Sequence, residues 1–131
     1  MLALPTLIGL FGLAVVAGML GRSWMGPAQA LGHLDDWATA AFAALAAVVL
    51  NNLPAASLLA AHAPARPFAL LVGLNLGPNL CVSGSLAWLI WLRSARSAQA
   101  RPSLATASRL GSVVVPLSLA GAVLALVLFG H

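Results

Sequence analysis

Four stretches without any charged side chain constrain the fold of this chain more than any other feature. They cover residues 1–21, 38–61, 67–92 and 110–130. Each is about as long as the roughly 20 residues that a membrane-spanning helix needs. With 62% hydrophobic residues, 6% charged residues and a mean hydropathy of +1.03, the chain has more apolar surface than a water-soluble core of 131 residues can bury. We therefore expect an all-α integral membrane protein made of a single domain.

The arginines give the predicted segments an orientation. Four of the six fall in residues 93–109. They are Arg93, Arg96, Arg101 and Arg109. The positive-inside rule places this loop in the cytoplasm, with Trp88 and Trp91 near the inner interface. We expect residues 1–21 and 110–130 to span the inner (plasma) membrane of the cell as part of a multi-pass protein. Residues 22–37 hold both carboxylates and are expected to form an interfacial connector.

An Asn-Asn-Leu-Pro motif interrupts the second apolar run, residues 38–61. In one continuous spanning helix, Pro54 would remove a backbone hydrogen bond, and Asn51 and Asn52 would need partners near mid-membrane. The alternative is a re-entrant hairpin over residues 38–66 that turns at the motif, with one asparagine capping the second arm and the proline in its first turn. Non-helical backbone at this depth persists only where it is buried in protein or lines a cavity. The motif therefore predicts a binding site.

The third apolar run, residues 67–92, carries a second interruption. Gly77-Pro78-Asn79 breaks the helix and Ser83-Gly84-Ser85 restarts it. A discontinuous helix beside a re-entrant tip is the layout of secondary transporters, in which half-helix ends point their dipoles at a substrate. A proline-kinked helix packed on its neighbours is the alternative. The predicted substrate-binding residues are those of the two interruptions: Asn51, Asn52, Pro54, Gly77, Pro78, Asn79, Ser83, Gly84 and Ser85.

These two interruptions resemble the carboxy-terminal part of the arsenical pump membrane proteins, the arsenite permeases of the ion transporter superfamily. Family members read N-N-x-P, then G-P-N or G-P-K, then T-P-I-G-S-L-A. The resemblance is strongest over residues 38–95. The matching positions are Asn51, Asn52, Pro54, Gly77, Pro78, Asn79, Gly84, Ser85, Leu86 and Ala87. In place of T-P-I the chain reads Cys81-Val82-Ser83.

The resemblance implies both a fold and a missing partner. Members of the superfamily are built from two inverted repeats with the site between them, and this chain is shorter than one repeat. The resemblance therefore implies the partial half of an inverted-repeat transporter, which needs the missing amino-terminal repeat. The implied activity is efflux of arsenite, with a small oxyacid or anion as substrate. The lipid bilayer is the other expected partner, and a homodimer of the full protein stays open.

Two further hypotheses about the function remain. One is a sodium-coupled di- or tricarboxylate or sodium/proton transporter of the same superfamily, and the other is a small structural membrane subunit without transport. An enzyme is not expected, because no catalytic Ser-His-Asp, Cys-His or paired-carboxylate set can be assembled in the apolar segments. We expect no cofactor and no metal, with His33, Asp35 and Asp36 solvated and Cys81 a small apolar side chain. Nucleic-acid binding is not expected either, because the arginines are explained by topology.

Overall fold

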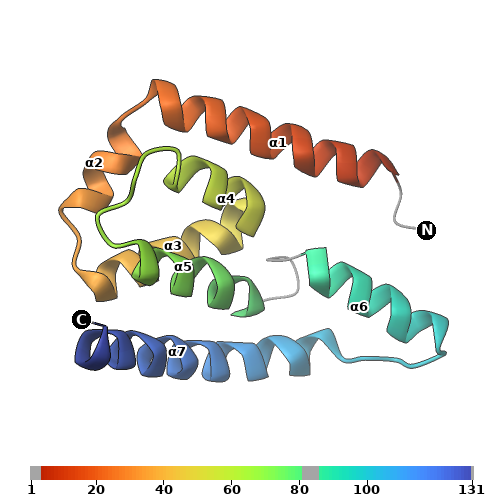
Figure 1. Ribbon diagram of the computed structural model, residues 1–131. Coiled ribbons are helices and arrows are strands. Elements are labelled where there is room, and N and C mark those ends of the chain that lie inside the picture. Colours follow the sequence, from red (N-terminus) through yellow and green to blue (C-terminus); the bar gives the residue numbers. More distant parts are fainter. Residues whose placement is uncertain (1–3, 81–85, 131) are drawn as a thin grey trace.

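The computed structural model of the protein describes residues 4–80 and 86–130, which are helical over most of their length (Figure 1). The expectation of an all-α fold is confirmed. The elements of this part of the chain are α1 (Leu4–Ser23), α2 (Gly26–Gly32), α3 (Asp36–Leu50), α4 (Asn52–Leu59), α5 (Pro67–Leu76), the 3₁₀ turn η1 (Gly77–Leu80), α6 (Leu86–Ser97) and α7 (Leu104–Phe129).

Helices α1 and α7 are long and apolar enough to cross a membrane, by length and composition. At the helical rise, their 20 and 26 residues correspond to about 30 Å and 39 Å, compared with a hydrocarbon core of about 30 Å. Only 17% of the apolar window of α1 and 11% of that of α7 are buried within the protein. Figure 1 shows the two helices along opposite edges of the molecule. Most of their apolar side chains therefore face the surroundings rather than a core.

Helices α3 and α5 run parallel and pack through small residues. Gly73 lies against the backbone oxygen of Ala40, and four residues further along, Gly77 lies against the backbone of Ala44. Because the contact positions increase in the same direction along both helices, α3 and α5 are parallel. Alanines occupy the buried face of α3 because only small side chains let two helix backbones approach this closely.

Helix α4 reverses the direction of α3 and packs between it and α1 (Figure 1). Gly18 of α1 lies beside Ser57, and Gly21 lies against Leu58, where an added Cβ would be 2.6 Å from the carbonyl oxygen. Helix α1 therefore runs parallel to α4, and the two end on the same side of the molecule.

Helix α7 runs antiparallel to α5 and covers it from the other side. Val123 is fully buried in a cluster with Ala40 and Ala69, near the start of α3 and α5. Near the other end of α7, a Cβ added to Gly111 would lie 2.5 Å from the carbonyl oxygen of Asn79. The core of the protein is thus the α3–α5 pair, with α4 and α1 on one side and α7 on the other.

The charged residues divide between the two ends of this helix arrangement. One end, which we call the neutral end, carries two arginines and two aspartates around α2 and the starts of α3 and α5: Arg22, Asp35, Asp36 and Arg66. The other end, the arginine end, comprises α6 and the start of α7 and holds the remaining four arginines. The whole formal net charge of +4 therefore comes from the arginine end.

Candidate functional site

The first interruption is at Asn51, which separates α3 from α4. Its backbone has φ 72° and ψ 153°, a region that is populated almost only by glycine. Asn51 occupies the N-cap position of α4 as expected, but its side chain makes no capping hydrogen bond. Pro54 lies in the first turn of α4, where its missing N–H leaves no helical bond unmade, and it is fully buried. The motif therefore turns the chain by a strained backbone rather than by a side-chain cap.

The strain at Asn51 is balanced by packing on both sides of it. The backbone N–H of Ala55 donates to the carbonyl oxygen of Asn51 at 3.1 Å, which starts the hydrogen bonding of α4. Ala55 is fully buried in the cluster that also contains Ala47 and Leu74. A residue held in this region of the backbone map costs about 1–3 kcal/mol and persists only where its surroundings fix it.

The second interruption is the 3₁₀ turn that follows α5. Pro78 and Gly77 are buried in it, and Pro78 supplies no N–H to continue the α-helical pattern. The side-chain amide of Asn75 donates a 2.8 Å hydrogen bond to the backbone carbonyl oxygen of Leu71. The side-chain amide of Asn79 donates a 3.2 Å hydrogen bond to the backbone carbonyl oxygen of Asn75. These asparagines thus bind carbonyl groups of their own helical segment. The predicted restart, with Ser83, Gly84 and Ser85, lies outside the described residues.

The tertiary structure brings the two interruptions to the same end of the α3–α5 pair. Gly77 packs against Ala44 in this parallel pair, so Leu80, three residues after Gly77, lies opposite Ala47. Asn51 is four residues beyond Ala47, which is about one helical turn, or roughly 6 Å, along α3. Asn52 and Asn79 are exposed, and Asn51 is half-buried. The amides therefore lie on the surface of the described part of the chain, beside a buried apolar contact, and do not enclose a cavity by themselves.

Two grooves adjoin these residues. One, of about 470 Å³, lies between α1 and α4 and extends from Leu53, next to Asn52, to Arg22 at the neutral end. The other, of about 560 Å³, lies between α6 and α7 and includes Asn79 and Gly111 in its lining. The contribution of α1 and α7 to these grooves was not predicted from the sequence. Gly18 and Gly111 line the grooves and lie close to neighbouring backbone, whereas Gly121 has nothing near it, so a glycine in an apolar helix is only a partial signal of such a contact.

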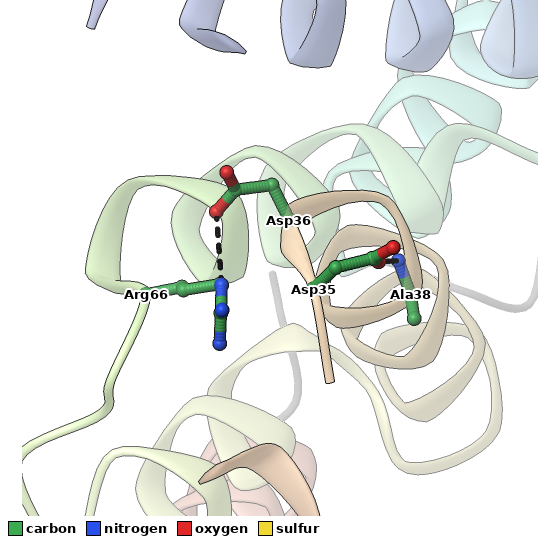
Figure 2. A network of polar contacts seen from close by, with 4 residues as sticks. All are labelled: Asp35, Asp36, Ala38 and Arg66. Carbon is green, nitrogen blue, oxygen red and sulfur yellow. Dashed lines mark hydrogen bonds and ion pairs between the residues drawn. The ribbon is translucent and has the colours of Figure 1, made fainter. Parts of the chain in front are cut away.

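The polar residues of the predicted connector have structural roles at the neutral end (Figure 2). A carboxylate oxygen of Asp35 accepts a 2.7 Å hydrogen bond from the backbone N–H of Ala38 and so caps α3. A carboxylate oxygen of Asp36 lies 3.5 Å from Nε of Arg66 at the start of α5. In the part of the chain that the structure describes, no three His, Cys, Asp or Glu residues gather as a metal site would require.

Two buried polar atoms near the neutral end were not anticipated from the sequence. Within the described residues, neither Oγ1 of Thr39 nor Nε2 of His62 has a hydrogen-bond partner. Thr39 belongs to the first turn of α3, and His62 to the segment between α4 and α5. Neither side chain lines one of the two grooves beside the interruptions.

Comparison with known proteins adds no relative: no family model, no curated protein and no solved structure matches the chain. The resemblance to arsenite permeases stays a prediction that depends on the motif residues.

Proposed function

We propose that this chain forms one wall of a membrane transport pathway, as the carboxy-terminal part of an arsenite efflux permease. The observation that carries the proposal is that the two helix interruptions lie at the same end of the α3–α5 pair, about one helical turn apart along its axis. Helix interruptions cost free energy, because they free backbone polar groups and remove apolar packing. Two of them side by side, with three asparagines, are explained economically by a solute that uses the freed groups.

The location in a membrane is supported by exposure and by charge. Both long helices present apolar side chains outward, and large apolar surfaces of this kind are stable where lipid covers them. The cationic charge is concentrated at one end of the helices, as the positive-inside rule requires of a cytoplasmic end. We place the arginine end in the cytoplasm and the neutral end on the opposite side of the inner membrane.

The re-entrant hairpin is supported by the ion pair of Asp36 with Arg66. This contact joins the start of α3 to the start of α5, so the chain between them leaves one end and returns to it. The 15 residues of α3 correspond to about 22 Å, which is less than the roughly 30 Å of the hydrocarbon core. In the proposed arrangement α3 and α4 enter and leave from the side opposite to the cytoplasm, with Asn51 inside the membrane.

The chemistry that this wall offers is neutral. After Asp36 the chain has no acidic side chain, so the polar groups of its apolar segments are mainly amides, hydroxyls and free backbone groups, with the single thiol of Cys81. Such groups suit a small uncharged oxyacid such as arsenous acid, or an anion held by dipoles. Asn52 and Asn79 are exposed, and a second wall is needed to close the site around a solute. In the proposed transporter the missing repeat supplies that wall.

Deletion of the gene in its source cell tests the proposal. Loss of the chain should raise the cellular content of arsenic after arsenite exposure and should slow growth. The wild-type gene should restore both, whereas Asn52→Ala should not, with membrane abundance of each variant measured by immunoblot. Unchanged arsenic content after deletion would remove arsenite as the solute, and unchanged uptake of sodium and carboxylates as well would remove transport altogether.

A structural membrane subunit is the second candidate, and one observation favours it. The amides of Asn75 and Asn79 donate to carbonyl groups within their own helical segment, which is what a purely structural asparagine does at a helix end. In this case, substitution of either asparagine would lower the amount of folded protein and any associated activity in the same proportion.

A further inference from the structure

The groove between α6 and α7 has the shape and lining of a site for an extended apolar chain. Its volume is about 560 Å³, and its lining along α7 extends from Ser103 to Val115, which corresponds to about 18 Å at the helical rise. Leu110 and Val114 provide an apolar floor, and both are otherwise exposed. Trp88 and Trp91 form the opposite wall.

The two tryptophans are fixed against each other. Their ring centroids are 5.2 Å apart and their planes are inclined by 85°, an edge-to-face contact. Tryptophan is typical of membrane–water interfaces, because its ring is apolar and its N–H is polar. A wall of two tryptophans therefore suits the depth where a lipid headgroup meets its acyl chains.

The mouth of the groove is polar and lies beside an arginine. Ser103 caps α7 by accepting a 3.2 Å hydrogen bond from the backbone N–H of Thr106, and both residues belong to the lining. Arg101 is exposed and directly precedes Pro102, which belongs to the lining. Arg109 is also exposed, but successive residues of a helix are about 100° apart, so Arg109 lies on the side of α7 turned away from Ala107 and Val114. The arginine end carries four arginines and, because both aspartates lie before α3 or in its first turn, no acidic residue. A negatively charged headgroup would meet attraction here without a competing carboxylate.

We propose that this groove binds one anionic phospholipid, with an acyl chain along Leu110 and Val114 and the phosphate near Arg101. A neutral lipid would fill the groove without using the charge, and a soluble phosphate would use the charge without the apolar floor. The proposal rests on the membrane location but does not depend on transport, so it can hold for a structural subunit as well.

Fluorescence quenching by brominated lipids tests the site directly. The full chain with Trp24→Phe and Trp37→Phe, reconstituted in vesicles, emits only from Trp88 and Trp91 among its tryptophans. Phosphatidylglycerol or phosphatidylcholine with dibrominated acyl chains is then mixed in at increasing mole fraction. We expect phosphatidylglycerol to quench at a lower mole fraction, by about fivefold for each arginine that contacts the headgroup at low salt. In 1 M NaCl the difference in quenching between the two lipids should shrink, because the Debye length falls to about 3 Å.

Two pairs of variants separate charge from shape. Arg101→Gln should remove the preference for phosphatidylglycerol, whereas Arg109→Gln, on the other face of α7, should keep it. Ala107→Phe fills the groove and should weaken quenching by both lipids, whereas Ala105→Phe, outside the groove lining, should not. Equal quenching by the two lipids in the starting protein overturns the charged site, and equal quenching in the two phenylalanine variants overturns the groove. If Arg101→Gln does not fold, the salt dependence and the phenylalanine pair still decide.

Discussion

Gly77 lies directly against the backbone of Ala44. A Cβ added to this glycine would be 2.5 Å from both the Cα and the carbonyl oxygen of the alanine. The second helix interruption is therefore fixed to α3 by main-chain contact, and there is no side chain between them that can move aside. The same contact sets the level of the Gly77–Leu80 turn relative to Asn51.

Gly77→Ala should destabilise the protein by about 1–3 kcal/mol, because the new methyl group forces the two backbones apart. Gly121→Ala in α7 is the matched control, since nothing lies within 4 Å of a Cβ at that position. The control should leave stability unchanged or raise it by up to about 1 kcal/mol through helix propensity. Thermal unfolding in detergent, followed by circular dichroism, measures both. Equal midpoints for the two variants would show that α3 and α5 do not pack as described.

Single cysteines should reveal that the two ends of the α3–α4 pair lie on one side of the membrane. In a Cys81→Ser background, Ala30→Cys and Ala65→Cys are expected to react with an impermeant maleimide from outside intact cells. Ser97→Cys, at the arginine end, should react only after the cells are opened. All three native residues are exposed. Reaction of positions 30 and 65 from opposite sides would mean that the α3–α4 segment crosses the membrane.

Substitutions at Asn51 should separate its backbone role from its amide. Asn51→Gly suits φ 72° and should keep or raise stability, whereas Asn51→Val should lower it by about 1–3 kcal/mol. If the amide also contacts solute, the glycine variant should fold normally and yet lose transport. Unfolding midpoints and transport per folded molecule are therefore measured together. A valine variant as stable as the wild type would argue against the backbone conformation.

Asn52→Ala and Asn79→Ala should each reduce transport by the intact transporter more than they reduce membrane abundance. A lost hydrogen bond to a buried polar group costs about 1–3 kcal/mol, which is roughly a fivefold to 150-fold loss in affinity. Cys81→Ser should have little effect on transport, because we expect this single cysteine to act as a small apolar side chain and not as a ligand. Uptake of arsenite into inverted vesicles, normalised to folded protein, provides the measurement. Normal specific activity in both asparagine variants would place the site elsewhere, and loss of activity in the serine variant would favour a thiolate ligand.

The chain expressed by itself should insert into the membrane but confer no resistance to arsenite. The reason is that Asn52 and Asn79 are exposed, and in the proposed transporter they belong to only one of the two walls of the site. Growth of an arsenite-sensitive host that lacks its own permease tests this, with membrane insertion checked by fractionation. Full resistance from these 131 residues would contradict the requirement for a second repeat.

The sequence alone determined the class of fold and the positions of the interruptions. Charge-free runs of about 20 residues predict an all-α chain, because a single run of this length can satisfy its backbone hydrogen bonds within itself as a helix. Proline and paired asparagines at residues 51–54 favour the break between α3 and α4, since the missing N–H of Pro54 costs no hydrogen bond in the first turn of a helix. Proline alone does not decide this, because Pro116 lies inside the continuous helix α7. These are local properties of the chain, so neighbouring residues suffice to predict them.

Only the tertiary structure decided how the interruptions lie relative to each other. The parallel register of α3 and α5 depends on Gly73 and Gly77 meeting alanines more than thirty positions earlier, and no local pattern encodes that pairing. Asn51 likewise has a positive φ at a turn that Ala47 on one side and Ala55 on the other bury, where a side-chain cap was expected instead. Close contact between small residues that are distant in sequence is a property of the packed helices. This contact brings the two interruptions to the same end of the α3–α5 pair.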